Sequence, residues 1–279
     1  MCGIFGFAGN IPKRQQLLTT LAALNEARGE DSTGYATVLP DRSYRICKRV
    51  MPAHDFLWQA EWSELTSLEP ARVGLGHTRW ASVGKVSQDN AHPHRVRNII
   101  LTHNGTINNL SHIAKREGKR FQSDSKALTY LISRYGNCRG ARGMASLAFV
   151  DLKSAADLTL QRWKKPLAIA EFKHGILYSS EERHLWSALA VSDLSDGADI
   201  WEVIDGTTVD IFLDADGRME DIDTRDALMI DDDLMSTRSK RGNTASASPE
   251  WDHLRAIWDK DEEDITDAEW EQYGKDIPF

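Results

Sequence analysis

The chain has 279 residues, a mass of 31.4 kDa and a formal net charge of −8, and 41% of its residues are hydrophobic. These values describe an ordinary soluble globular protein with enough chain for one large domain or two small ones. No run of 18 apolar residues is present, and the N-terminus lacks the basic segment and long apolar stretch of a signal peptide. We therefore expect a cytoplasmic protein with no contact with the membrane.

The distribution of charge and of cysteine excludes two further classes. Residues 250–276 hold 11 acidic and 3 basic side chains, a net −8, so the rest holds 31 of each sign (42 − 11 and 34 − 3). A neutral body with an acidic tail argues against nucleic acid as the main ligand. Cys2, Cys47 and Cys138 are odd in number and widely spaced, which argues against a disulfide framework or a paired-cysteine metal site.

The spacing of apolar residues predicts a mixture of strands and helices in the first half of the chain. Leu17, Leu18, Leu21 and Leu24 have the spacing of one helical face, which Gly29 follows. Strands are expected at 4–8, 33–39, 43–50, 73–80 and 98–103, the second and third forming a hairpin, and helices at 13–27 and 53–65. The last two strands flank a loop rich in Gly, Asn, His and Pro.

The second half begins with helices and returns to strands. Helices are expected at 107–117, 124–135 and 181–189, and strands at 144–152, 158–163, 167–172 and 176–179. Segments 200–204 and 208–213 are expected to form a closing pair of strands. Strands, a central block of helices and strands again indicate two sheets with helices packed outside them.

A change in composition near residue 236 divides the chain into three parts. Residues 2–235 are expected to form one domain, and residues 236–248 a linker, because they contain no large apolar side chain. Residues 249–279 form an acidic tail with three tryptophans, Trp251, Trp258 and Trp270. Two short helices are expected in this tail, and helices of that length need a surface to pack on. That surface is either the protein's own body or a groove on a partner.

Cys2 has a chemical possibility that no other residue has. Removal of Met1 would leave a thiol and a free α-amine on one residue. An α-amine has a pKa of about 7.7–8.0, so near neutral pH it can act as a base toward its own thiol. This matches the way in which an N-terminal amine activates a threonine nucleophile. Position two alone is weak evidence for catalysis.

Six short motifs strengthen that interpretation. In chain order they are Cys2-Gly3-Ile4-Phe5-Gly6, Arg28-Gly29-Glu30-Asp31-Ser32-Thr33-Gly34, Gly76-His77-Thr78-Arg79-Trp80-Ala81, Asn90-Ala91-His92-Pro93-His94, His103-Asn104-Gly105 and Ser123-Asp124. In this order and spacing, over residues 2–213, the chain resembles the class II glutamine amidotransferases, most closely the glutaminase domain of glucosamine phosphate synthases. The resemblance implies the α+β fold of the N-terminal-nucleophile hydrolases, a four-layer αββα sandwich.

The resemblance also implies a catalytic role for three residues. Cys2 would attack the side-chain amide of glutamine, and its own amine would carry the proton to the leaving ammonia. The Asn104 side chain and the Gly105 backbone N–H would form the oxyanion hole, where a single donor is worth about 10²–10³ in rate. The reaction would yield glutamate and ammonia through a thioester on Cys2. Arg28 and Asp31 are expected to be structural, holding the turn after the first helix.

Three further residues would bind the substrate, which is a zwitterion. Arg79 would bind the α-carboxylate through its planar guanidinium, Asp124 would pair with the α-ammonium group, and Ser82 would also contact the carboxylate. Two positions depart from the family pattern. Val83 stands where a histidine is frequent, and Glu30 stands where an aromatic residue is common, which could change the rim of the pocket.

Neither a metal nor a cofactor is expected. His77, His92, His94 and His103 could suggest zinc, but no acidic or thiolate partner stands at a recognisable spacing.

Three functions remain open at this stage. The first is a glutaminase subunit that delivers ammonia to a synthetase on another chain, its partner protein. The second is a stand-alone amidohydrolase acting on a different small amide, which would not need both Arg79 and Asp124. The third is a catalytically idle regulatory subunit, for which loss of Cys2 or Asn104 would be expected.

Overall fold

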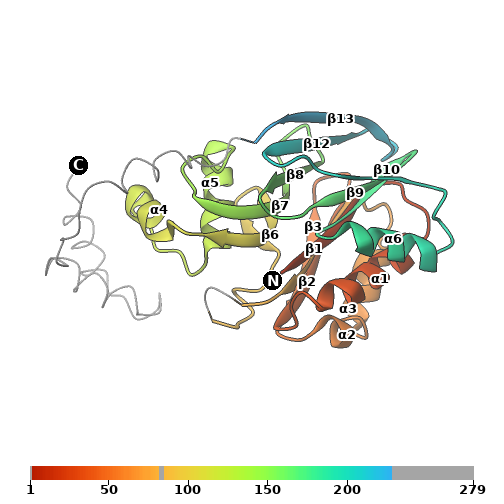
Figure 1. Ribbon diagram of the computed structural model, residues 1–279, viewed down its shortest axis with the longest axis horizontal. Coiled ribbons are helices and arrows are strands. Elements are labelled where there is room, and N and C mark those ends of the chain that lie inside the picture. The colour runs from red at the N-terminus through yellow and green to blue at the C-terminus, as the bar shows by residue number, and fades with distance from the viewer. Residues whose placement is uncertain (1, 82–84, 228–279) are drawn as a thin grey trace, which may run out of the picture.

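Two antiparallel sheets lie face to face between two layers of helices in the computed structural model, which describes residues 2–81 and 85–227 (Figure 1). The strand order is β11-β9-β10-β1-β4-β2-β3 in the first sheet and β13-β12-β8-β7-β6-β5 in the second. All neighbouring strands run antiparallel. The expected four-layer αββα sandwich is therefore confirmed.

The first sheet is covered on its outer face by helices from three parts of the chain. Its strands are β1 (Gly3–Gly9), β2 (Ser32–Val38), β3 (Tyr44–Arg49), β4 (Val73–Arg79), β9 (Ala168–Phe172), β10 (Gly175–Ser179) and β11 (Asp199–Glu202). The covering helices are α1 (Arg14–Glu26), α2 (Ala53–Phe56), α3 (Ala60–Ser67) and α6 (Glu182–Val191). A cluster of buried side chains that includes Phe5, Leu21 and Leu185 joins the two layers.

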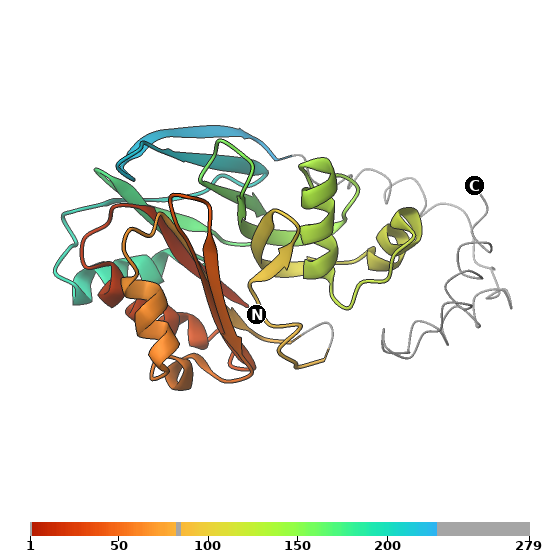
Figure 2. The ribbon, with the colours of Figure 1, turned by 180° about the vertical axis from the view of Figure 1, so that it is seen from behind.

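The second sheet is covered by two helices that follow β6 in the chain (Figure 2). Its strands are β5 (His94–Val96), β6 (Ile99–Ile107), β7 (Gly143–Asp151), β8 (Leu158–Trp163), β12 (Thr207–Leu213) and β13 (Met219–Asp226). The helices are α4 (Leu110–Glu117) and α5 (Asp124–Tyr135). Leu101, Leu128 and Leu147 belong to the cluster between this sheet and its helices.

The central strand β1 explains why the N-terminal segment is apolar throughout. Ile4 and Ala8 point into the core between the two sheets, and Phe5 and Phe7 pack under the helices on the other face. All seven residues of β1 are buried, because both faces of the sheet are covered. The same strand pairs with β10 on one edge and β4 on the other, which fixes the residue before it, Cys2, at the end of the sheet.

Four details of the structure differ from the sequence-based expectation. The helix expected at 53–65 is two short helices, because the backbone is extended at Gln59, before α3. The strand expected at 98–103 continues to Ile107, so the following helix begins only at Leu110. The expected closing pair of strands is wrong: β11 extends the first sheet beside β9, and β12 lies in the second sheet between β8 and β13. Strand β5 lies in a segment that was expected to be a loop, and no element was expected at β13.

Parts of the sequence-based prediction lie outside the described residues. These are Ser82, Val83, the end of the 2–235 domain beyond residue 227, the 236–248 linker and the 249–279 tail. Across the described ranges, no helix combines the length and the apolar character that a membrane crossing requires.

Candidate active site

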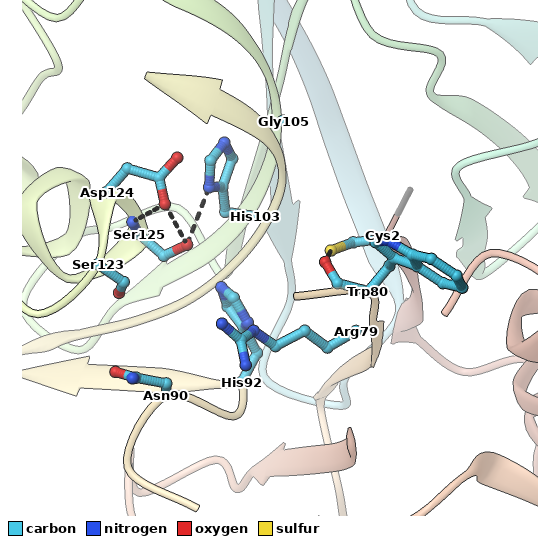
Figure 3. Close-up of a pocket in the computed structure, with 10 residues that line it drawn as sticks. All are labelled: Cys2, Arg79, Trp80, Asn90, His92, His103, Gly105, Ser123, Asp124 and Ser125. Carbon is cyan, nitrogen blue, oxygen red and sulfur yellow. Dashed lines mark hydrogen bonds between the residues drawn. The ribbon is translucent and has the colours of Figure 1, made fainter. Parts of the chain in front are cut away.

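A pocket lies where the end of β4, the middle of β6 and the start of α5 meet Cys2 (Figure 3). It is lined by Cys2, Arg79, Trp80, Asn90, His92, His103, Gly105, Ser123, Asp124 and Ser125. Four of these, Cys2, Arg79, Gly105 and Asp124, were expected from the sequence to form one site. In Figure 3 Cys2 lies toward one side of the pocket and Asp124 toward the other, with Arg79 extending between them.

Cys2 is held at the pocket by its backbone as well as by β1. Its carbonyl oxygen accepts a hydrogen bond from Nε of Arg28 at 2.8 Å, and its Sγ lies 3.5 Å from the carbonyl oxygen of Trp80. Burial raises the pKa of the Cys2 thiol, while the charge of Arg79 acts in the opposite direction. The resting thiol is therefore neutral near pH 7 and needs a base to become a nucleophile.

Asn104 lies against the backbone of Cys2 rather than on the pocket wall. With its amide oriented to satisfy both neighbours, Nδ2 donates to the Cys2 carbonyl oxygen at 3.1 Å and Oδ1 accepts from Nη2 of Arg28 at 3.3 Å. Arg28 also forms an ion pair with Glu181, next to α6. Sequence reasoning assigned Arg28 to a structural turn, and the structure shows that it also binds the carbonyl group of Cys2 and the amide of Asn104.

At Gly105 the backbone of β6 lines the pocket, and the neighbouring atoms leave no room for a side chain at this position. A Cβ atom at this position would lie 2.0 Å from the carbonyl oxygen of Met144 and 2.8 Å from Nε2 of His103. A glycine is therefore required for β6 to approach β7 at this point.

Arg79 and Asp124 supply a buried charge of each sign. Arg79 is 4% exposed and donates from Nη1 to the Lys85 carbonyl oxygen at 3.2 Å. Asp124 is 5% exposed and accepts from the backbone N–H of Ile107 at 3.0 Å and of Ser125 at 2.9 Å. Asp124 is also the first residue of α5, so the helix dipole favours its negative charge.

A row of buried imidazole rings lies beside the pocket. The His77 and His92 rings stack with centroids 3.9 Å apart, and His94 lies 4.3 Å beyond His92. Burial lowers the pKa of His77 to about 3 and the pKa values of His92 and His94 well below their usual range. His103 donates or accepts through Nδ1 with Ser125 Oγ at 3.0 Å.

These rings are packed as neutral side chains. Within residues 2–81 and 85–227, no group of three or more His, Cys, Asp or Glu side chains is arranged to hold a metal ion.

Several pocket residues were not assigned to the site from the sequence. Asn90 is 6% exposed, donates from Nδ2 to the Lys85 carbonyl at 3.2 Å, and has an Oδ1 without a partner in the described structure. Trp80, Ser123 and Ser125 also line the pocket. Asn90, Trp80 and Ser123 belong to the motifs quoted above, so the motifs were a signal for them. Glu30, expected to alter the rim of the pocket, is exposed and does not line it.

The chain is similar to known proteins both in sequence and in structure. No family model matches the chain. It is 33% identical over 215 residues to the isomerizing glutamine–fructose-6-phosphate aminotransferase of Bradyrhizobium diazoefficiens, covering 70% of this chain and 33% of the relative. The Helicobacter pylori enzyme of the same name is 28% identical over 197 residues, covering 64% of this chain and 32% of the relative. The chain thus spans about a third of the length of these relatives.

Two solved structures share the fold at 20% sequence identity. One is the glutamine phosphoribosylpyrophosphate amidotransferase of B. subtilis complexed with ADP and GMP, with a TM-score of 0.61. The other is described as the allosteric regulatory enzyme of purine biosynthesis, with a TM-score of 0.62. Each match covers 81% of this chain and 49% of the solved one.

Proposed function

We propose that this chain, a relative in sequence and fold of the class II glutamine amidotransferases, hydrolyses the side-chain amide of glutamine to glutamate and ammonia. The observation that carries the proposal is the meeting of Cys2, Gly105, Arg79 and Asp124 in one pocket. Free glutamine carries a carboxylate, an ammonium group and a neutral amide, and the pocket offers a matching cation, anion and nucleophile.

The reaction begins with the removal of Met1, which frees the α-amine of Cys2. This amine takes the thiol proton, and Sγ attacks the amide carbon of glutamine to give a tetrahedral intermediate. The oxyanion accepts hydrogen bonds from the Gly105 N–H and from Nδ2 of Asn104. Nδ2 has two N–H groups, so one can stay on the Cys2 carbonyl while the other binds the oxyanion.

The intermediate collapses as the C–N bond breaks and the amine returns the proton to the leaving ammonia. A water molecule then attacks the γ-glutamyl thioester, which releases glutamate and restores the Cys2 thiol. Because burial raises the pKa of this thiol, the mechanism requires a base close to Sγ, and the α-amine of the same residue is that base.

Binding of the amino-acid end of glutamine falls to Arg79 and Asp124. Arg79 donates to the α-carboxylate, and Asp124 accepts from the α-ammonium group. Asp124 keeps two backbone N–H donors while doing so, because a carboxylate has about four acceptor positions. Ser82 adds a hydroxyl to the carboxylate site in this proposal.

The ammonia then passes to an acceptor at a synthetase site on another chain. The relatives named above are aminotransferases, and this chain matches only about a third of their length. In this proposal the acceptor site corresponds to the part of those relatives that this chain does not match. Cross-linking followed by mass spectrometry of native material tests the partner, and recovery of the chain alone from cross-linked cells would contradict it.

The central experiment measures ammonia release from glutamine by the purified protein and by Cys2→Ala. We expect loss of activity in this variant with the fold retained, and full activity in the control Cys47→Ala, which changes a cysteine on β3 away from the pocket. Intact-mass measurement should show that active protein begins at Cys2. Near-normal turnover by Cys2→Ala would place the nucleophile elsewhere.

The alternatives predict different outcomes in the same assay. Glutaramate, which is glutamine without its α-amino group, should be hydrolysed poorly because it leaves Asp124 unpaired. Equal hydrolysis of glutamine and glutaramate would favour a stand-alone amidohydrolase for another amide. Binding of glutamine without any release of ammonia would favour a catalytically idle regulatory subunit.

A further inference from the structure

A group of basic side chains lies on the second helical layer, away from the pocket. Residues 110–142 contain eight Lys and Arg and two acidic residues, Glu117 and Asp124, which gives a net charge of +6 (8 − 2). Asp124 belongs to the pocket, so Glu117 is the only acid of this segment outside the active site. The active-site proposal uses none of the eight cations.

Four of these cations, Arg116, Lys119, Arg134 and Arg139, are exposed and lie close together, and we call them the α4–α5 basic face. Nη1 of Arg116 donates to the carbonyl oxygen of Arg139 at 3.4 Å, which joins α4 to the loop after α5. Arg142 closes the same loop, since its carbonyl accepts from the Asn108 N–H before α4 at 2.7 Å.

Lys119 and Arg134 belong to the face because both contact Tyr130 of α5. Nζ of Lys119 lies 5.4 Å from the ring centroid of Tyr130, and Nη1 of Arg134 donates to its hydroxyl at 2.8 Å. Lys119, Arg134 and Arg139 are exposed, as is Arg116.

Glu117 neutralises only part of this face. Its side chain is 2% exposed and lies 2.7 Å from Nε of Arg116 and 3.9 Å from Nε of Arg134. Four cations and one acid leave +3 on this face (4 − 1). Tyr135, which is 48% exposed, adds an aromatic ring beneath the guanidinium of Arg134. Such a face suits a ligand that is both acidic and aromatic.

The tail of the same chain has this composition. Residues 250–276 carry 11 acidic and 3 basic side chains, and Trp251, Trp258 and Trp270 lie among them. The net charge of −8 in the tail is therefore opposite in sign to the charge of the face.

The described chain ends at the end of the second sheet where β7 begins. Ala227 follows β13 and donates its N–H to Gly206, just before β12, at 2.7 Å. From there the sheet continues through β8 to β7, and Arg142 directly precedes β7. Three strand spacings of about 4.8 Å and three residues along β7 put Arg142 about 15–20 Å from Ala227.

The intervening segment is long enough to cover that distance. Residues 228–248 are 21 residues, which span up to about 70 Å when extended and about 25 Å as a flexible coil. Because the tail is tethered within reach of the face, its effective concentration there is high, about the millimolar range.

We propose that the acidic tail, residues 249–279, docks in cis on the α4–α5 basic face. Acidic side chains of the tail pair with Arg116, Lys119, Arg134 and Arg139, and at least one tryptophan packs on Tyr135. The pocket residue Asp124 begins α5 and Tyr135 ends it, about 17 Å apart along the helix. Docking at the far end of α5 leaves the glutamine pocket open, so it is independent of the proposed catalysis.

Hydrogen–deuterium exchange on the full-length protein tests the proposal. In about 0.05 M salt, amides of residues 251–273 should exchange about tenfold more slowly in wild type than in the face-reversal variant Lys119→Glu/Arg139→Glu. The control Lys153→Glu/Lys173→Glu makes the same change in net charge on two exposed turns elsewhere, and should leave the tail protected. In about 1 M salt the wild-type protection should largely disappear, because charges are then screened beyond about 3 Å.

A charge reversal in the tail tests the same contacts even if the face-reversal variant is less stable. Glu262→Lys/Glu263→Lys alone should lose protection, and its combination with the reversed face should recover part of it. Fast exchange of the wild-type tail at low salt would overturn the proposal. Protection that is the same in the face-reversal variant would also overturn it, as would protection that appears only at high protein concentration or on addition of a partner protein.

Discussion

Replacing His92 by Phe should make the stability of the protein less sensitive to acid. The His92 ring lies between those of His77 and His94, and neither of its nitrogens has a hydrogen-bond partner among the described residues. Phe has a flat ring of similar size, so the substitution keeps the stacking and removes only a titratable group. Burial lowers the pKa of His92 well below its usual range, which means that the folded protein holds this ring neutral.

The size of the effect follows from the proton that the unfolded chain binds and the folded chain does not. An unfolded histidine has a pKa of about 6.5, so its contribution to stability is fully present above that value and decreases as the pH falls. Integrated from pH 7 to pH 5, one histidine that stays neutral when folded costs about 2 kcal/mol of unfolding free energy. The wild type should therefore lose about 2 kcal/mol more than His92→Phe over this interval.

Urea unfolding at pH 7 and pH 5, followed by tryptophan fluorescence, measures this difference. Carboxylates and the other histidines contribute equally to both proteins, so their effects cancel in the comparison. Equal losses of stability in wild type and His92→Phe would refute the reasoning, since they would show that His92 is protonated in the folded state or is not buried in solution.

Three further predictions concern the pocket. Arg79→Lys and Asp124→Asn should each lower kcat/KM for glutamine by about 10- to 100-fold through loss of a charge-assisted hydrogen bond, and unchanged steady-state kinetics would exclude these residues from binding. Asn104→Ala should lower kcat by about 10²–10³ with little change in KM if its amide binds the oxyanion, whereas a change in KM alone would assign it to ground-state binding. Gly105→Ala should destabilise the fold by about 1–3 kcal/mol in thermal unfolding, because its Cβ would lie 2.0 Å from the Met144 carbonyl oxygen; an unchanged Tm would mean that β6 and β7 can separate there.

The sequence predicted the layers of the fold better than its edges. Strands buried on both faces, such as β1 and β10, were found because they are apolar runs of the right length. β13 was missed because it is an edge strand whose side chains are mostly exposed, half of them acidic, and edge strands often carry such charges. The resemblance to class II glutamine amidotransferases and the αββα fold are confirmed by the comparisons.

Strand pairing was the part of the fold that local pattern could not supply. β11 and β12 are adjacent in sequence, and each looks like half of a hairpin. They separate because Asp199–Glu202 pairs with β9 and Thr207–Leu213 with β8, which lie in different sheets. Apolar spacing indicates that a segment is a strand, but the strand that it pairs with depends on residues about 30 to 50 positions away.

The sequence predicted those site residues that belong to short contiguous motifs. Cys2, Arg79 and Asp124 were expected to share a pocket, and they do. Asn104 was expected beside them, but its amide faces the Cys2 carbonyl and Arg28, a contact that depends on the packing of β6 against the start of β1. Their chemical roles remain predictions.

The position of β1 at the centre of the first sheet also has a consequence for how the chain is made. Phe5 pairs with Ser179, so the strand that leaves the ribosome first gains its second neighbour only 174 residues later. At about 5–20 residues per second, that interval lasts roughly 10–35 s. During this time the N-terminus is accessible to the peptidase that removes initiator methionine. Once β10 arrives and the sheet closes, Cys2 is fixed at its end, so the removal of Met1 that the proposed function requires has this interval in which to occur.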